Sequence, residues 1–282
     1  MKTILYIIIA LFISGAFISA FVNKQNNKTT IVLKSENQNI DSISLKSSAH
    51  IISNRLSDFG CDSFIVDINE KWNVIKVTLK NNSNISTIKR LITQKGDVGF
   101  YETINRRKFI SSVYDSRYIL SIFNGLAKTN DVIGCTSKWK VRRVNKFLTK
   151  FGLDKYYKFA WFINSENSVC SLYALNDAEH GNGVMYASDI EDVLVQTMNK
   201  GMSTIHINFK KEASKKWENV TWHNFNNPIA VLIDGQVFTP VTKTVYKAGN
   251  CKLTGELSEK DMMYFMAITN NGMLSNSFKV IW

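Results

Sequence analysis

Proline is scarce in this chain, with only Pro228 and Pro240 among its 282 residues. This scarcity excludes a proline-rich linker. Long apolar runs are scarce too: a single stretch is long enough to cross a bilayer, which excludes a protein with several membrane spans. Hydrophobic residues still make up 45% of the chain and charged residues 21%, a composition typical of a folded protein and not of a disordered or collagen-like one.

Acidic residues are the minority among the charges. The chain has 23 Asp and Glu against 35 Lys and Arg, which gives a formal net charge of +12 at pH 7. Such an excess indicates an anionic partner or surface. The length allows one large domain or two modest ones, each able to bury a core without disulfide or metal support.

The N-terminal residues have the pattern of an export segment. No residue in 3–22 is charged, while Lys2 precedes this run and Lys24 follows it. The pattern fits either a cleaved signal peptide or an uncleaved anchor in the inner membrane. We therefore predict that residues 1–23 are a signal or a membrane anchor. The rest of the chain is expected on the periplasmic face, either anchored or secreted after cleavage.

The cysteines do not form a recognisable metal or redox motif. Their positions contain no CxxC spacing: Cys61, Cys135, Cys170 and Cys251. In an oxidising compartment four cysteines allow three disulfide pairings, and the sequence does not choose between them. Buried free cysteines are the other reading.

Motifs for catalysis are missing. The chain has no GxSxG, HExxH, GxxxxGK[ST] or GxGxxG sequence. The histidines are far apart in sequence and lack ligands at metal-binding spacing: His50, His180, His206 and His223. We expect neither an enzyme nor a bound metal or cofactor.

Hydrophobic periodicity predicts a mixed α+β fold. Along residues 30–103 the order is strand, helix, strand, strand, helix, strand, with a hairpin over 64–77 and a last strand at 98–101. This order is typical of a split-βαβ, ferredoxin-like layer of helices on an antiparallel sheet. Further along, Asp234-Gly235 predicts a tight hairpin turn, and Ser258 with Asp261 predicts the start of a helix that ends at Gly272. Asp189, Glu191 and Asp192 indicate another helix start.

The positive charge is concentrated in one window. Residues 106–158 contain thirteen Lys or Arg and three Asp. Within it, apolar residues recur at helical spacing through 141–151, which predicts an amphipathic helix with a positive wet face. This face is either simply solvated or a contact for anionic lipid or an acidic protein. The basic and aromatic residues also resemble a nucleic-acid footprint, but an exported protein rarely meets nucleic acid, so no nucleic-acid partner is expected.

Several blocks of sequence resemble a known family. Residues 49–60, AHIISNRLSDFG, are similar to the helix motif A-x-x-I-x-x-R-(I/L)-x-x-x-G of the first large periplasmic domain of SecD. Residues 229–240, IAVLIDGQVFTP, are similar to I-A-I-V-L-D-G-x-V-x-S-x-P of the same domain. Weaker blocks occur at 96–103, 159–175, 217–224 and 247–258, and all the blocks have the same order along the chain as in SecD and the fused SecDF form.

This resemblance implies an architecture and a role. It implies a membrane segment at 1–23, a ferredoxin-like base formed by 24–103 and 252–282, and an inserted α+β head at 104–251. SecD and SecDF are auxiliary membrane proteins of the Sec export machinery. We therefore expect a non-enzymatic, extracytoplasmic SecD-like domain that assists protein export. It would bind an unfolded or emerging polypeptide, or components of the Sec translocon.

A second function remains open from the sequence. A drifted SecD-like module would use its basic head to bind anionic lipid or an envelope protein. Edge strands and adaptable apolar surfaces accept extended chains without reading their sequence. The residues expected to contact a polypeptide or partner lie on the basic helix and at the hairpin turn: Trp139, Lys140, Arg142, Arg143, Lys146, Phe147, Asp234 and Gly235.

Overall fold

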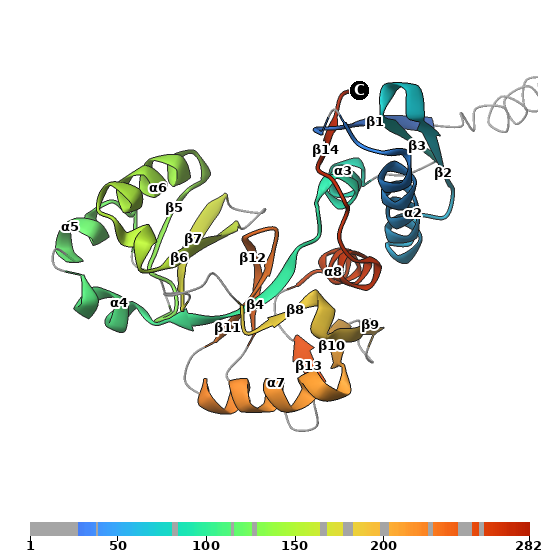
Figure 1. Ribbon diagram of the computed structural model, residues 1–282. Helices are drawn as coiled ribbons and strands as arrows, with labels where there is room; N and C mark the ends of the chain where they lie inside the picture. Colours follow the sequence, from blue (N-terminus) through green and yellow to red (C-terminus); the bar gives the residue numbers. More distant parts are fainter. Residues whose placement is uncertain are drawn as a thin grey trace, which may run out of the picture.

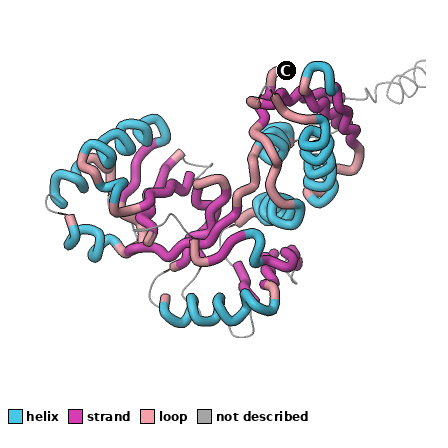
Figure 2. The backbone as a smooth tube through the Cα atoms, viewed as in Figure 1, coloured by secondary structure: helices cyan, strands magenta, loops and turns pink. Residues whose placement is uncertain are grey.

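The computed structural model describes residues 28–37, 39–80, 84–113, 116–125, 129–163, 168–176, 183–197, 203–224, 228–241, 250–253 and 257–282. The fold is mixed α+β, as predicted (Figure 1, Figure 2). The expected signal or anchor at 1–23 lies outside the described residues. No helix within the described part of the chain is both long and apolar enough to cross a membrane.

Helices and strands are interspersed along the described residues. The helices are α2 (Ser42–Asp58), α3 (Ile85–Thr93), α4 (Arg106–Ser112), α5 (Ser116–Ser121), α6 (Val141–Lys150), α7 (Lys211–His223) and α8 (Glu259–Asn271). The strands are β1 (Lys28–Ser35), β2 (Phe64–Asn69), β3 (Val74–Lys80), β4 (Val98–Ile104), β5 (Gly134–Ser137), β6 (Lys158–Ile163), β7 (Val169–Leu175), β8 (Met185–Tyr186), β9 (Ile190–Thr197), β10 (Ser203–Phe209), β11 (Ile229–Ile233), β12 (Gln236–Val241), β13 (Asn250–Leu253) and β14 (Phe278–Val280). Short 3-10 turns are η1 (Glu70–Trp72), η2 (Lys138–Lys140), η3 (Leu153–Lys155) and η4 (Ala187–Asp189).

The first sheet is antiparallel and has the strand order β14-β1-β3-β2. Helices α2 and α3 cover one of its faces, at the upper right of Figure 1. Apolar residues at helical spacing along α2 predict the face that packs on this sheet, and all four are buried: Leu45, Ala49, Ile52 and Leu56. The expected hairpin is confirmed, with Val66 opposite Val77.

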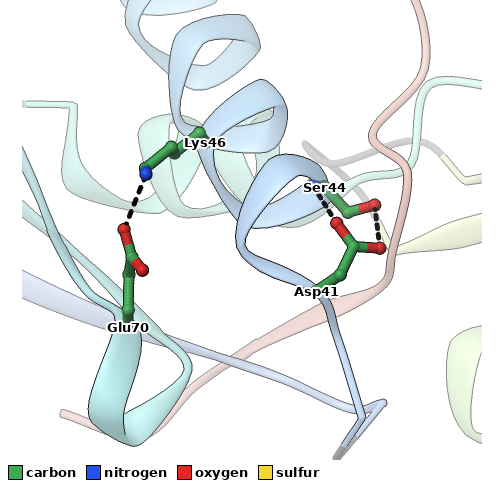
Figure 3. A network of polar contacts seen from close by, with 4 residues as sticks. All are labelled: Asp41, Ser44, Lys46 and Glu70. Atoms are coloured by element: carbon green, nitrogen blue, oxygen red, sulfur yellow. Dashed lines mark hydrogen bonds and ion pairs between the residues drawn. The ribbon is translucent and has the colours of Figure 1, made fainter.

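The start of α2 is fixed by polar contacts (Figure 3). Asp41 is its N-cap: one carboxylate oxygen accepts from the backbone N–H of Ser44 at 2.7 Å, and the other accepts from the Ser44 hydroxyl at 2.9 Å. These bonds lower the pKa of Asp41. Lys46, one turn into the helix, forms an ion pair with Glu70 of η1 at 2.9 Å. The helix is therefore tied at its first turns to the turn between β2 and β3.

The prediction that residues 98–101 form the last strand of this sheet is wrong, although these residues do form a strand. Residues 98–101 were predicted to close the ferredoxin-like sheet, but they belong to β4, which pairs with β11 in another sheet. The C-terminal strand β14 takes the place beside β1 instead. Val98 and Phe100 are buried on one side of β4 and Tyr101 and Thr103 on the other. A strand buried on both faces needs cover on both sides, whereas the described elements cover the first sheet on one side alone.

The second sheet has the order β5-β7-β6-β12-β11-β4-β8, and a further pairing of β7 with β4 closes part of it into a ring. The ring encloses a small core that includes Tyr101, Tyr173, Leu175 and Leu232. The outer faces of β6 and β7 pack with α4, α5 and α6 around a separate core. The predicted two-residue turn between β11 and β12 is confirmed, since Ile233 pairs with Gln236.

A third sheet, with the order β13-β10-β9, lies between α7 and α8 (Figure 1). Its core is continuous with that of the first sheet. Phe100, Phe209 and Trp217 form an aromatic cluster there, with ring centroids 5.0 to 5.7 Å apart. The helix expected to start near Asp189 is wrong: η4 ends at that residue, and Glu191 and Asp192 lie in β9.

Candidate functional site

The predicted amphipathic helix exists as α6. Val144 and Leu148 are buried in the core beneath it, while Arg142, Arg143 and Lys146 are exposed. Together with η2, the segment 138–150 carries six Lys or Arg and no acidic residue. Because no acidic residue of this segment balances these charges, the outer side of the helix has a positive potential that attracts anions.

Aromatic rings stand beside these charges. Trp139 is 75% exposed, and the Lys140 ammonium lies 4.9 Å from the centre of its ring. Lys140 also donates a hydrogen bond to Asn124 Oδ1 at 2.6 Å. Phe147 stacks on Phe151 with 4.5 Å between ring centroids. Six of the predicted contact residues therefore lie on consecutive turns of η2 and α6, and we call them the basic helix surface: Trp139, Lys140, Arg142, Arg143, Lys146 and Phe147.

A groove that the sequence reasoning missed runs along the other side of α6. Its volume is about 510 Å³, and it lies between α6, η3 and β6. It is lined by Asn145, Leu148, Thr149, Asp154, Lys155, Tyr157, Lys158, Phe159 and Trp161. The signal for it in the sequence is the alternation of aromatic residues at 157, 159 and 161, because alternate residues of a strand share one face.

The floor of the groove is fixed by specific contacts. Trp161 donates its indole N–H to Asn145 Oδ1 at 2.8 Å, which joins β6 to α6. The Tyr157 hydroxyl lies 2.5 Å from the Ser112 hydroxyl, and its ring packs edge-on against Phe109. Half-buried aromatic rings with a polar rim suit side chains of varied shape, because the ring faces are apolar and the rim is wet. The groove can thus accept apolar side chains of an extended chain.

Asp234 and Gly235 do not join this surface. Both have positive φ, 49° and 77°, as a two-residue hairpin turn requires. The Asp234 carboxylate accepts hydrogen bonds from the backbone N–H groups of Gly96 and Asp97, at 2.9 and 2.8 Å. The turn is thereby attached to the segment between α3 and β4, while α6 lies at the far side of the molecule (Figure 1).

Two of the family-like blocks meet in space. Glu102, in the block at 96–103, accepts hydrogen bonds from Asn176 at 2.8 Å and from Asn224 at 2.5 Å. Thr103 donates its hydroxyl hydrogen to the carbonyl of Pro228 at 2.6 Å. Asn224 ends the block at 217–224. These hydrogen bonds join β4 to the end of α7 and to the residues beside β7 and β11, so the residues have a structural role.

A second hollow lies beside the first sheet. Its volume is about 520 Å³, and it is lined by Phe59, Gly60, Cys61, Asp62, Ser63, Lys80, Asn84, Glu259, Lys260 and Met263. Lys260 donates to Asn84 Oδ1 at 3.2 Å across it. It contains none of the predicted contact residues. Its lining mixes both charges with little aromatic surface, so it is a weaker candidate than the groove beside α6.

The structure also places the cysteines and histidines. Cys61 is buried, the other three cysteines are free thiols, and burial raises the pKa of Cys170 and of Cys251. His50 and His223 are exposed, and burial lowers the pKa of His206, while His180 lies outside the described residues. No group of three or more His, Cys, Asp or Glu within the described ranges could hold a metal ion.

Comparison with known proteins finds similarity to SecD and SecDF. Residues 176–275 match the family described as SecDF, P1 head subdomain. The chain is 26% identical over 102 residues to the protein translocase subunit SecD of Acidaminococcus fermentans, a match that covers 36% of this chain and 24% of that protein. The chain thus matches about a quarter of that relative's length.

Two solved structures share the fold. A crystal structure of SecDF in a super-membrane-facing form matches with a TM-score of 0.54 and 16% identity, covering 97% of this chain and 34% of that one. A structure of SecDF, a membrane component that enhances protein export, matches with a TM-score of 0.50 and 18% identity, covering 90% of this chain and 98% of that one. The predicted resemblance to SecD and SecDF is therefore confirmed: about a third of the chain is similar in sequence to SecD and to the SecDF head subdomain, and the fold is shared with SecDF.

Proposed function

We propose that this chain is an extracytoplasmic SecD-like domain that assists Sec-dependent protein export by binding unfolded polypeptide. The single observation that carries the proposal is the match of residues 176–275 to the SecDF head subdomain. The SecD relative is a protein translocase subunit, which supports the same process. The chain would act without catalysis and without a cofactor. Components of the Sec translocon are the other partners that this role implies.

The proposed architecture is a base and a head. The sequence predicts a ferredoxin-like base from 24–103 and 252–282 and a head from 104–251, and the match at 176–275 supports a head that extends to about residue 275. The strand order β14-β1-β3-β2 with α2 and α3 on one face supports the ferredoxin-like base. Because β4 pairs with β11, the head begins in this proposal at about residue 98 instead of 104. Residues 1–23 would be the inner-membrane anchor or a cleaved signal.

The polypeptide would lie in the groove beside α6. Unfolded chains expose apolar side chains, and the half-buried rings of Tyr157 and Phe159 offer apolar surface without a fixed shape. Exposed Trp139 and the Phe147–Phe151 stack extend this surface around the helix. The contact is of low sequence specificity, because side chains carry it through apolar area and not through a defined set of hydrogen bonds.

The basic helix surface supports a second candidate function, binding of anionic lipid or an acidic envelope protein. The six cations of segment 138–150, with no acidic residue among them, favour it. The two functions differ in their response to salt. Attachment through exposed charges weakens steeply as ionic strength rises, while apolar contact does not.

The experiment titrates the full chain, reconstituted in nanodiscs, with one small protein in its native form and in a permanently unfolded form. We expect preferential binding of the unfolded form that changes less than threefold between about 50 and 300 mM salt. Thr149→Trp fills the groove from an exposed position of α6, and it should weaken this binding about tenfold or more. Thr149→Ser is the matched control and should leave it unchanged.

The basic helix surface is tested in the same titration. Arg142→Ser, Arg143→Ser and Lys146→Ser together should have little effect on polypeptide binding at 300 mM salt. Equal binding of both protein forms, or binding that disappears in the triple variant and at high salt, would favour the second function. Cross-linking during translocation then identifies the translocon component that the domain contacts.

A further inference from the structure

The first sheet has an open face with an unusual distribution of charge. Strand alternation turns Ile31 and Leu33 of β1 toward α2 and α3, where both are fully buried. The alternate residues of β1, from Lys28 through Val32 to Lys34, point to the opposite side of the sheet. Lys34 on β1, Lys76 on β3 and Lys279 beside β1 on β14 lie on this open face, and all three are exposed. None of the helices described in residues 28–282 covers this face (Figure 1), so the lysines on it are open to solvent.

Two pairs of these lysines are direct cross-strand neighbours. Lys34 lies opposite Lys279, and Lys28 lies opposite Lys80 at the end of the sheet where β1 begins. Side chains directly opposite each other in antiparallel strands have Cβ atoms about 5 Å apart, so like charges there repel and destabilise the sheet. An anionic surface laid across the strands relieves this repulsion.

Few carboxylates balance this charge. Asp67 lies opposite Lys76, and Glu36 follows the end of β1. Glu70, at the same end of the sheet as Lys34, is already paired with Lys46 of α2 (Figure 3). The open face therefore carries five lysines against one aspartate within its strands. It is complementary to a partner with many negative charges spread over a plane.

Protection of a sheet edge does not account for these lysines. Lysines often occur on edge strands, where they prevent pairing with another chain. Lys34 and Lys76 lie on β1 and β3, which are the two inner strands of the order β14-β1-β3-β2. Both neighbours of each inner strand are present, so no free edge requires protection there. The charge belongs to the face of the sheet.

Exposed apolar and aromatic side chains accompany the lysines. Ile65 of β2 is 51% exposed and Ile281, which follows β14, is 50% exposed. Trp72 in the turn between β2 and β3 and Trp282 at the C-terminal end are also exposed. Tryptophan favours the headgroup region of a bilayer, and lysine extends its ammonium to phosphate while its stem covers apolar surface. This combination matches the chemistry of a phospholipid surface.

The N-terminal sequence places such a surface within reach. The uncharged run ends at Val22, and five residues separate it from Lys28 at the start of β1. Even fully extended, this stretch spans no more than about 20 Å. We propose that the open face of this sheet lies against a bilayer containing anionic phospholipid, and that its lysines contact the phosphate groups. This goes beyond export assistance and involves neither α6 nor its groove.

The test places a photo-reactive amino acid on the open face. Thr78 of β3 lies on that face between Lys76 and Lys80, and it is replaced by p-benzoylphenylalanine in the full chain. The protein is reconstituted in nanodiscs of phosphatidylcholine with or without about 30% phosphatidylglycerol, illuminated, and analysed for lipid adducts by mass spectrometry. We expect at least fivefold more adduct with phosphatidylglycerol present, because each lysine contributes about a fivefold gain in binding to an anionic surface.

A matched pair of triple variants locates the effect. Lys34→Ser, Lys76→Ser and Lys279→Ser should reduce the adduct at least fivefold while leaving polypeptide binding unchanged, so this proposal and the proposed function fail independently. Arg142→Ser, Arg143→Ser and Lys146→Ser removes the same charge from α6 and should leave the adduct within twofold. Absence of lipid adducts at position 78, or equal yields in both lipids, would overturn the proposal.

Discussion

Arg55 and Asp234 hold the same short link of the chain, one through its carbonyls and the other through its amides. The Arg55 guanidinium donates to the carbonyls of Gln94 at 2.7 Å and Lys95 at 3.0 Å. Asp234 accepts from the next two backbone N–H groups, those of Gly96 and Asp97. This link is where the chain leaves α3 and enters β4. Its polar backbone is therefore satisfied by side chains from α2 and from the β11–β12 turn.

Arg55 also binds the segment in which the chain leaves α8 and returns to the first sheet at β14. It donates to the carbonyls of Leu91 at 3.2 Å and of Gly272 at 2.5 Å, the residue that ends α8. The backbone N–H of Leu274 in turn donates to the Lys95 carbonyl at 2.8 Å. Burial lowers the pKa of Arg55 to about 10, and the nearby Asp234 charge opposes this shift. Arg55 remains protonated at neutral pH. One buried cation therefore binds both the segment between α3 and β4 and the segment that follows α8.

Removing the Arg55 guanidinium should destabilise the folded state. We expect Arg55→Ala to lower the free energy of unfolding by about 3 kcal/mol, because four carbonyls lose a charged donor inside the protein. Arg55→Lys should recover only part of this loss, since one ammonium cannot reproduce the planar fork of the guanidinium. Urea unfolding followed by tryptophan fluorescence measures both. Equal stability of the alanine variant and the wild type would contradict the role given to Arg55.

Two substitutions of Asp234 distinguish a structural role of its carboxylate from a role in polypeptide binding. Asp234→Asn keeps an oxygen that can accept from Gly96 and Asp97 and tolerates positive φ, so its unfolding free energy should stay within about 0.5 kcal/mol of the wild type. Asp234→Ala loses both bonds and the tolerance for φ of 49°, and should lose about 2 kcal/mol. If Asp234 contacted a polypeptide through its charge, the Asn variant would weaken that binding in the same titration used for the groove.

Gly96 tests the contact between the link and Arg55. Its φ is +89°, and an added Cβ would collide with the Arg55 guanidinium. We expect Gly96→Ala to cost about 3 kcal/mol, part from positive φ and part from the collision. In the Arg55→Ala background the collision is absent, so the double variant should be less destabilised than the sum of the single variants, by about 1 kcal/mol or more.

Gly60 is the matched control for this comparison of the single and double variants of Gly96 and Arg55. Its φ is +84°, almost the same as that of Gly96, but an added Cβ would meet no atom within 4 Å. Gly60→Ala should therefore show the cost of positive φ alone, about 1 to 2 kcal/mol, and should add to Arg55→Ala without coupling. Coupling of similar size at both glycines would mean that the Arg55 contact is not what constrains Gly96.

Local patterns were the reliable part of the sequence. The stripe in α2, the 64–77 hairpin, the Asp234-Gly235 turn and the Ser258 cap of α8 depend on neighbours a few residues away, and the structure has all of them. The partner of β4 could not be predicted in this way, because Val98 and Phe100 suit any buried strand. Which sheet they join depends on β11 and β14, which lie more than 120 residues further along the chain.

The candidate site was predicted in part for a related reason. The exposed cations of α6 follow directly from helical spacing, so the basic helix surface was found. The groove requires β6 to lie beside α6, and the bond between Trp161 and Asn145 that joins them has no counterpart in local sequence. Arg55 was visible only as one letter of a family motif. Its role needs four carbonyls from two segments far apart in sequence, residues 91–95 and Gly272, which no local pattern reveals.

Tyr264 makes stability depend on alkaline pH. Its phenol is buried in α8 against Arg90, which donates to its oxygen at 3.1 Å, and burial raises the pKa of Tyr264 to about 12. In the unfolded chain a tyrosine loses its proton near pH 10. Below pH 10 the phenol is neutral in both states, and its contribution to stability is fully present. Between about pH 10 and 12 the unfolded state alone ionises, so that contribution is lost.

We therefore expect the wild type to lose about 2 kcal/mol more than Tyr264→Phe between pH 9 and 11.5 in urea unfolding, since a two-unit shift corresponds to about 2.7 kcal/mol. The phenylalanine ring still packs on the Arg90 guanidinium, whose carbon lies 4.1 Å from the ring centre in the wild type. Tyr173, whose pKa burial also raises, is present in both proteins and cancels in the difference. The lowered pKa of Arg55 acts with the opposite sign, and because the Tyr264 charge raises that pKa, the difference measures Tyr264 together with its coupling to Arg55. Parallel pH profiles for the two proteins would show that Tyr264 ionises alike in the folded and unfolded states.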